Sequence, residues 1–327
     1  MSPTRSNAEA GTSDRELVIV RTLKAPRDRV WQAWSDPAQL QEWWGPRGIT
    51  TESVSMDLRS GGSWRLIMRA PDGTKFTNRM DYLEVQKGSR LVYDQGADDE
   101  SPRPFRVYVT FSDLPGGRTR LEIRMVCPTP EALQGIKEVV KKYDGLSTWD
   151  RLAEHVSPSD TFVITRAFDA PRDLMFRVWS EPRHLQKWLA PKGFTGEYRR
   201  ADLRPGGSTH YVLSGPGGAK MWGKARYLEV ARPERLVYVQ SFSDENEGTT
   251  RHPMSATWPL EMKTTVELEE LDRDRTQVTV TWEVYGTATP EERETFKKSR
   301  GGMNQGWGGT FEQLEGYLKE VGDRRPE

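Results

Sequence analysis

Cysteine is almost absent from this chain of 327 residues, because Cys127 is the only one. A single thiol cannot form an intramolecular disulfide, which is typical of a protein from a reducing compartment. Long apolar runs are missing as well, and no stretch approaches the roughly 20 residues that a membrane-spanning helix needs. Residues 1–14 lack the apolar segment of a signal peptide and indicate a disordered polar tail. We therefore expect a cytoplasmic protein without membrane insertion.

Neither sign of charge is in excess, since Lys plus Arg and Asp plus Glu each number 48. This balance gives no reason to expect nucleic acid as a partner. Histidine is scarce, with four in the chain. No two of them have the spacing of metal ligands, and Cys127 has no histidine beside it. We expect neither a metal nor a cofactor, and we assign no catalytic residue.

The chain does contain a long internal duplication with an offset of 145 positions. Residues 17–93 align without a gap to residues 162–238, and 34 of these 77 aligned pairs are identical. Ala25-Pro26-Arg27-Asp28 returns as Ala170-Pro171-Arg172-Asp173, and Tyr82-Leu83-Glu84-Val85 returns as Tyr227-Leu228-Glu229-Val230. A repeat of this length is long enough for each copy to have its own core. The duplication predicts two tandem homologous domains.

Within each copy the hydrophobic period changes from helical to extended. An apolar run is followed by two short helical signals, such as Asp36-Pro37, an N-cap residue before a first-turn proline. Period-2 segments separated by turn signals follow; Leu121, Ile123 and Met125, for example, alternate with charged residues. Each copy closes with a helical pattern, beginning at Thr129-Pro130 and Thr289-Pro290. This order predicts an α+β fold: an antiparallel sheet, two short helices after its first strand, and a long C-terminal helix.

The only short polar break between the copies is Val156-Ser157-Pro158-Ser159-Asp160. We accordingly place the first domain at residues 15–156 and the second at residues 161–321.

Several motifs of the second copy resemble the bacterial family named after the activator of Hsp90 ATPase, within the SRPBCC helix-grip superfamily of START and Bet v 1 type. They are Gln240-Ser241-Phe242-Ser243-Asp244, Arg251-His252-Pro253-Met254, Thr257-Trp258-Pro259-Leu260-Glu261-Met262 and Met303-Asn304-Gln305-Gly306-Trp307. The first copy lacks the Phe-Ser-Asp and Arg-His-Pro-Met segments. It has Lys142-Tyr143-Asp144-Gly145-Leu146 where the Met-x-x-Gly-Trp run should be.

This resemblance implies a curved sheet around a long C-terminal helix, with an apolar cavity between them. Members of the superfamily bind lipids, sterols, polyketides or other hydrophobic molecules, and some cyclise polyketides. The tandem layout is also similar to helix-grip proteins of enediyne biosynthetic clusters. A hydrophobic small molecule is thus the expected partner, held in two pockets or in one shared compartment. An enzyme of cyclase or hydrolase type and an Hsp90 co-chaperone module remain alternatives.

Aromatic and methionine side chains are the candidate ligand-binding residues, because they offer a large contact area at little cost in rotamer entropy. The alternative for each tryptophan is ordinary core packing, to which we assign Trp34 and Trp179. The full candidate set is Trp43, Trp44, Phe76, Met80, Met125, Trp149, Trp188, His210, Met221, Trp258, Trp282, Met303, Trp307 and Phe311.

Five glycines crowd the start of the last helical pattern, at positions 301, 302, 306, 308 and 309. Each costs roughly 1 kcal/mol against alanine inside a helix. Either the helix begins after them, or the small residues leave room for a ligand.

Polar candidates are few. His210 and Arg65 share one repeat position; we expect surface exposure, and a polar contact with a ligand is the alternative. Glu84 and Glu229 also share a position. They are expected in water near strand ends, although a buried carboxylate could act as a general acid or base. The polar segment 243–257 is expected to form a mobile lid, whose shorter counterpart spans residues 96–104.

Overall fold

The computed structural model describes residues 13–100, 102, 104–158 and 160–322. Most of the tail predicted at residues 1–14 lies outside the described residues, and positions 13 and 14 belong to a short 3-10 turn, η2 (Ser13–Arg15). The chain forms two compact units, Met1–Pro158 and Ser159–Glu327. The division falls inside the polar break at residues 156–160.

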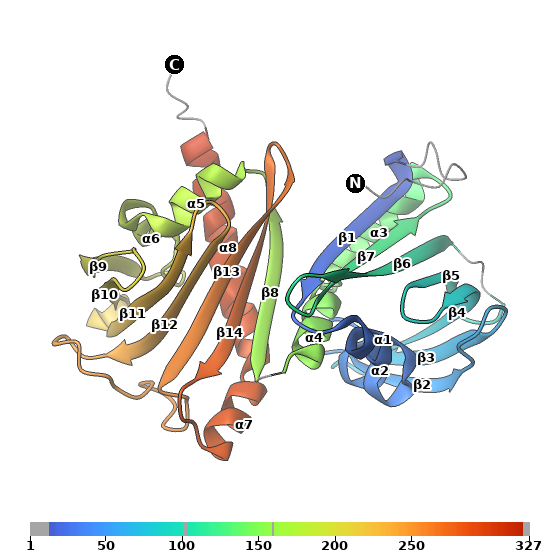
Figure 1. The fold of residues 1–327 in the computed structure, drawn as a ribbon, viewed down its shortest axis with the longest axis horizontal. Coiled ribbons are helices and arrows are strands. Elements are labelled where there is room, and N and C mark those ends of the chain that lie inside the picture. Colours follow the sequence, from blue (N-terminus) through green and yellow to red (C-terminus); the bar gives the residue numbers. More distant parts are fainter. Residues whose placement is uncertain (1–12, 101, 103, 159, 323–327) are drawn as a thin grey trace. The chain divides into compact units, whose positions relative to one another are not determined.

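The first unit is a seven-stranded antiparallel sheet with four helices. The strand order is β1-β7-β6-β5-β4-β3-β2, so that each strand from β2 to β7 pairs with its neighbour in sequence and β1 closes the edge beside β7. Figure 1 shows these elements in blue and green. Their bounds are β1 (Glu16–Leu23), α1 (Arg27–Ser35), α2 (Pro37–Trp43), β2 (Thr50–Met56), β3 (Ser63–Arg69), β4 (Lys75–Gln86), β5 (Arg90–Gly96), β6 (Phe105–Leu114), β7 (Arg118–Val126), α3 (Pro130–Lys142) and α4 (Ser147–Val156).

The second unit repeats this topology with the order β8-β14-β13-β12-β11-β10-β9. Its helix α8 runs along one face of the sheet (Figure 1). The elements are β8 (Thr161–Phe168), α5 (Arg172–Ser180), α6 (Pro182–Trp188), β9 (Thr195–Ala201), β10 (Ser208–Ser214), η3 (Pro216–Gly218), β11 (Lys220–Ala231), β12 (Arg235–Ser243), β13 (Glu261–Asp272), β14 (Arg275–Tyr285), α7 (Pro290–Lys298) and α8 (Arg300–Gly322).

Three helix starts follow from capping residues in the sequence. Asp36 accepts a hydrogen bond from the backbone N–H of Ala38 at the start of α2. Thr129 caps α3 in the same way, and Thr289 and Glu292 form a full capping box at α7. Glu181 gives α6 no side-chain cap, so proline at the first position marks that start.

The long closing helix is interrupted, which corrects one sequence expectation. In the first unit the pattern that begins at Thr129 does not run through to His155. It stops at Lys142, and α4 begins at Ser147 after Asp144 takes a φ of 51°. In the second unit the break lies at Ser299, and α8 contains all five crowded glycines. The alternative that this helix begins after the glycines is therefore wrong.

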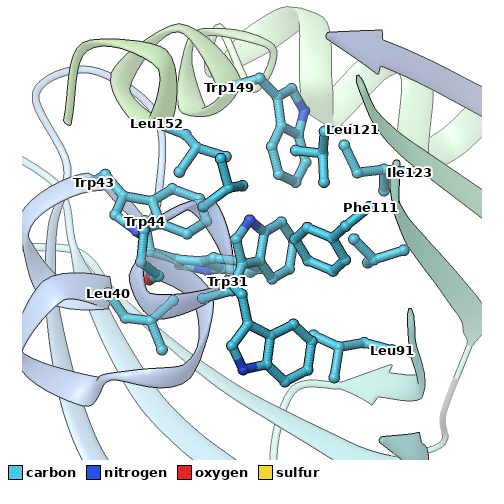
Figure 2. Packing of buried hydrophobic residues seen from close by; sticks show 14 of the residues in the cluster. Trp31, Leu40, Trp43, Trp44, Leu91, Phe111, Leu121, Ile123, Trp149 and Leu152 are labelled. Atoms are coloured by element: carbon cyan, nitrogen blue, oxygen red, sulfur yellow. Dashed lines mark hydrogen bonds between the residues drawn. The ribbon is translucent and has the colours of Figure 1, made fainter. Parts of the chain in front are cut away.

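Each unit has its own hydrophobic core. Trp34 and Trp179, which the sequence assigns to the core, are each 3% exposed. In the first unit, indoles from α1, α2 and α4 meet Phe111, Leu121 and Ile123 of the sheet (Figure 2). In the second, Trp307, Phe311, Leu314 and Leu318 of α8 pack on β8, β13 and β14.

Candidate functional site

A cavity of about 360 Å³ lies in the second unit. It is bounded by α6, by the inward faces of strands β9 to β14, by the segment between β12 and β13, and by α8. Eight aromatic rings contribute to its wall, those of Tyr198, Tyr211, Trp222, Tyr238, Phe242, Trp258, Trp282 and Trp307. All of the lining residues belong to the second unit. A mostly apolar cavity of this size is typical of a small-molecule site.

Five of the predicted ligand-binding residues line this cavity: Met221, Trp258, Trp282, Met303 and Trp307. The other predicted residues of the second unit lie elsewhere in the structure. Trp188 is fully buried, and its indole N–H donates to the carbonyl of Val178 at 3.2 Å. Phe311 is also fully buried and packs edge-on against Phe168.

The predicted residues of the first unit make core contacts. Trp43, Trp44, Met80 and Trp149 belong to its hydrophobic core, and Met125 packs against it from a half-buried position. Phe76 lies against the ring of Tyr143, with 5.6 Å between centroids. Core packing, the alternative to ligand contact, accounts for what these side chains touch.

The 145-residue offset allows the two interiors to be compared position by position. Leu189, which lines the cavity, aligns with Trp44, and Thr209 aligns with Trp64. In the first unit the rings of Trp44 and Trp64 meet edge to face with centroids 4.9 Å apart. Two indoles thus occupy positions that carry a leucine and a threonine in the second unit. The first unit has larger core side chains at these two positions, and the smaller Leu189 lines the cavity of the second.

Arg151 of α4 was not identified from the sequence, yet it organises the first unit. Its guanidinium donates hydrogen bonds to the carbonyls of Glu42, Gly45, Pro46 and Ile49. Burial lowers the pKa of this guanidinium. In the second unit Gln313 of α8 donates to the carbonyl of Ala190 at 2.8 Å. The loop after the second short helix is therefore tied to the closing helix in both units, by a cation in one and an amide in the other.

His210 is buried, so the expectation of surface exposure is wrong. It is 2% exposed, and its ring stacks on Trp222 with centroids 5.0 Å apart. Its Nε2 donates to the carbonyl of Asp244 at 3.1 Å. Trp222 of β11 pairs with Val212 of β10, which lies two residues after His210. This register places the indole over the imidazole. His210 holds the segment after β12 and is not among the residues that line the cavity.

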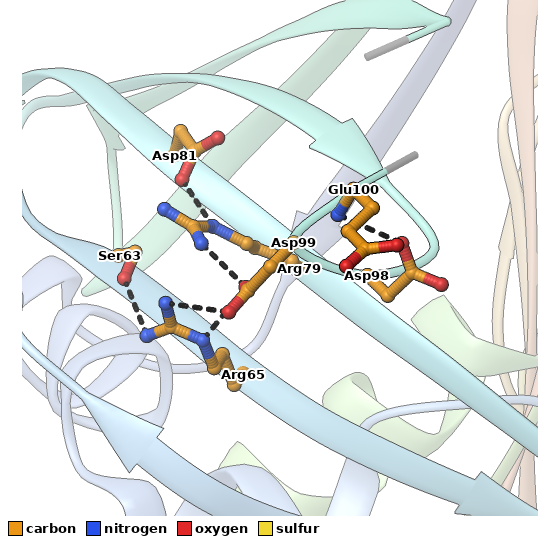
Figure 3. A network of polar contacts seen from close by, with 7 residues as sticks. All are labelled: Ser63, Arg65, Arg79, Asp81, Asp98, Asp99 and Glu100. Carbon is orange, nitrogen blue, oxygen red and sulfur yellow. Dashed lines mark hydrogen bonds and ion pairs between the residues drawn. The ribbon is translucent and has the colours of Figure 1, made fainter. Parts of the chain in front are cut away.

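The first-unit counterpart of this contact is an ion-pair cluster. Arg65 aligns with His210, and Asp99 aligns with Asp244. Both Arg65 and Arg79 pair with the carboxylate of Asp99, and Arg79 also pairs with Asp81 (Figure 3). The hydrogen bonds from Arg65 and Arg79 lower the pKa of Asp99 to about 2. At this repeat position, Arg65 holds the loop after β5 by ion pairs, whereas His210 holds the loop after β12 by a hydrogen bond.

The repeated carboxylates lie at the solvent side, as expected. Glu84 pairs with Arg90 at 3.3 Å and Glu229 with Arg235 at 3.7 Å. The side chains of Glu84 and Glu229 are 37% and 43% exposed, and neither lines the cavity. Their surroundings do not make them general acids or bases.

The lining contains polar residues that were not selected from the sequence, among them Tyr198, Tyr211, Gln240 and His252. Nδ1 of His252 accepts the backbone N–H of Met254 at 3.0 Å, which leaves the proton of the neutral ring on Nε2. Burial lowers the pKa of His252 and raises the pKa of Tyr198 and Tyr211. All three are therefore neutral near pH 7.

The segment between β12 and β13 forms part of the cavity wall through His252, Trp258, Pro259 and Leu260. Arg251 in this segment donates to Glu292 at the start of α7, and the hydrogen bond from Arg251 lowers the pKa of that carboxylate. The predicted lid thus lies at the cavity; its mobility stays a prediction.

Among the described residues, no cluster of three or more His, Cys, Asp or Glu side chains could hold a metal ion. None of the described helices has the length and apolar character to cross a membrane.

The family model for the Activator of Hsp90 ATPase homolog 1-like protein matches residues 24–157 and again residues 169–319. The chain belongs to this family, as a tandem of two α+β helix-grip domains. None of the curated proteins matches this chain.

Three of the solved structures that are similar to it illustrate the match. A protein from Arthrobacter aurescens is 26% identical, with a TM-score of 0.42 over 50% of this chain and 87% of its own. Protein Ms6760 from Mycobacterium smegmatis is 24% identical, with a TM-score of 0.41 over 49% of this chain and 91% of its own. The di-domain ARO/CYC BexL from the BE-7585A biosynthetic pathway is 15% identical, with a TM-score of 0.36 over 95% of this chain and 100% of its own.

Proposed function

We propose that the second unit binds a hydrophobic small molecule in the cavity between its sheet and α8. The observation that carries this proposal is the mostly apolar cavity of about 360 Å³ in this unit, whose lining includes eight aromatic rings. Burial of about 200 Å² of apolar ligand surface corresponds to about 5 kcal/mol before the costs of association. The aromatic wall favours a flat or conjugated ligand, such as a polyketide or polyene.

Binding without catalysis fits the lining better than a cyclase or hydrolase does. Apart from tyrosine hydroxyls, His252 is the titratable side chain among the described residues of the wall. General acid–base chemistry needs a positioned proton donor and acceptor. Nδ1 of His252 already accepts the N–H of Met254.

Two narrower roles and the cellular location remain predictions. A place in enediyne biosynthesis or self-resistance depends on the tandem layout, and an interaction with Hsp90 depends on the family name. A cytoplasmic location is supported by the single, buried Cys127.

The decisive variant for binding copies the first unit into the second. Leu189→Trp places an indole at the sequence position of Trp44 and takes up space at the cavity wall. Leu228→Trp is the matched control, because Leu228 is 38% exposed on β11 and does not line the cavity. Isothermal titration with 9-fluorenone, a rigid aromatic ketone, measures the affinity.

We expect the unsubstituted chain and Leu228→Trp to bind alike, and Leu189→Trp to bind at least about tenfold more weakly, since steric exclusion removes the site. Undiminished binding by Leu189→Trp would place the ligand elsewhere and contradict the proposal.

A further inference from the structure

The side chain of Gln240 lacks the hydrogen-bond partner that its repeat counterpart has. In the first unit the amide of Gln95 donates to Oδ1 of Asn78 at 3.2 Å. Gln240 aligns with Gln95, but Gly223 aligns with Asn78 and offers no side chain. Within the described part of the chain, the side chain of Gln240 has no hydrogen-bond partner, and it lines the cavity. A single replacement between the copies thus frees an amide at an apolar wall.

Tyr211 occupies the place that the asparagine side chain has in the first unit. A Cβ atom added to Gly223 would lie 2.5 Å from both Cζ and Oη of Tyr211. Glycine is therefore required for this ring to cross the strand. Tyr211 of β10 lies opposite Gly223 of β11, and Gly223 is diagonal to Gln240 of β12. The phenol that crosses Gly223 therefore extends toward the strand that carries the amide.

His252 lies at the same end of the cavity. Its ring meets Phe242 with centroids 4.7 Å apart, and Phe242 is opposite Gly223 on the neighbouring strand. With Nδ1 occupied by the Met254 N–H, the ring presents Nε2–H as a donor. The amide, the phenol and the imidazole are neutral polar groups on a lining that is otherwise mostly apolar.

Charge excludes one large class of ligand. None of the described residues that line the cavity is Lys or Arg. A carboxylate or phosphate brought into this volume would lose its hydration without gaining a cation, which costs several kcal/mol. A ketone or phenol oxygen carries no such cost and pairs with neutral donors.

We propose that Gln240 and Tyr211, with His252 beside them, form a subsite that recognises a carbonyl or hydroxyl oxygen on a neutral, otherwise apolar ligand. The inference rests on the proposed function and specifies its ligand class. Free fatty acids and phospholipid headgroups are excluded, and oxygenated polycyclic or polyene molecules are selected over the corresponding hydrocarbons.

Three probes with one skeleton test this subsite: fluorene, 9-fluorenone and fluorene-9-carboxylate, each measured by equilibrium dialysis against the full chain. We expect 9-fluorenone to bind about 3- to 10-fold more tightly than fluorene, the value of one net hydrogen bond, and the carboxylate to bind most weakly. Gln240→Leu and Tyr211→Phe should each reduce the preference for the ketone while fluorene binding is retained. Gln95→Leu, the repeat control, should change neither.

The outcomes separate the two proposals. Equal affinity for fluorene and 9-fluorenone, or a ketone preference that survives in both Gln240→Leu and Tyr211→Phe, overturns the subsite and leaves the cavity proposal standing. Failure of all three probes to bind the unsubstituted chain overturns both. Tyr211→Phe keeps the ring and removes only the hydroxyl, so it carries the test if Gln240→Leu does not fold.

Discussion

The indole of Trp307 stacks on that of Trp179, with ring planes 17° apart and centroids separated by 6.0 Å. In the first unit Trp149 stacks on Trp34 in the same way, at 12° and 5.9 Å. The two closing helices therefore meet the first helix of each copy through the same pair of rings. What differs is the residue beside this pair: Trp44 contacts both rings in the first copy, and its counterpart Leu189 lines the cavity in the second.

Trp44 is expected to stabilise the first unit strongly. Its indole contacts Trp34, Trp43, Trp64 and Trp149. Trp44→Leu should lower the free energy of unfolding by about 2–3 kcal/mol, because the residual space is only partly closed. Urea denaturation followed by tryptophan fluorescence measures this. The reciprocal Leu189→Trp enters an existing cavity and should cost less than half as much; equal costs for the two variants would argue against filled and hollow interiors.

Gly306 of α8 is expected to control access to the cavity. It lines the cavity, and an added Cβ would meet no atom within 4 Å. Gly306→Leu should therefore weaken binding of 9-fluorenone by about tenfold or more through steric exclusion. Gly302→Leu is the control, since Gly302 is an exposed helical residue outside the lining. Both variants gain helix propensity, so a loss of binding shared by both would trace to the helix and not to the cavity.

Acid should destabilise the chain below about pH 6.5, the ordinary pKa of histidine. Burial lowers the pKa of His155, His184 and His252 in the folded state. A depressed pKa means that the unfolded chain binds protons first, so this stability is present above pH 6.5 and is lost as the pH falls through the lowered values.

Melting temperatures between pH 7.5 and 5 measure this loss. His252→Asn should flatten part of the dependence, because the asparagine oxygen can accept the Met254 N–H without titrating. A melting temperature that rises on acidification would contradict lowered histidine pKa values in the folded state.

Six tyrosines should resist ionisation while the chain is folded. Burial raises the pKa of Tyr82, Tyr93, Tyr198, Tyr211, Tyr227 and Tyr238. A raised tyrosine pKa gives stability that is present below pH 10 and is lost as the pH rises. Tyrosinate absorbance at pH 11 should show these six only after guanidinium is added. Full ionisation of all ten tyrosines in the native state would show that the two interiors are wetter than described.

The architecture could be predicted from local signals. The duplication predicted two copies of one topology, and the caps at Asp36, Thr129 and Thr289 predicted helix starts that the structure confirms. The break at Asp144 was missed because a positive φ is rare for a residue other than glycine. Its neighbour Gly145 was the available signal.

The site was harder to predict, because its wall depends on which residues face inward across paired strands. Met221, Trp258 and Trp307 were found by residue type alone, and the same criterion also selected Trp43 and Trp44, which pack in the core. Gln240 was missed because its free amide is a consequence of Gly223 on the next strand. Comparison of Gly223 with Asn78 in the repeat would have revealed it.

Methyl NMR of methionines during titration with 9-fluorenone tests the central claim most directly, because methionines mark both interiors. Met221, Met262 and Met303 line the cavity, whereas Met56 and Met80 belong to the core region of the first unit. The account predicts that the methyl signals of the first group shift and saturate together while those of Met56 and Met80 stay in place. Shifts confined to Met56 and Met80, or none in the first group at saturating ligand, would contradict it.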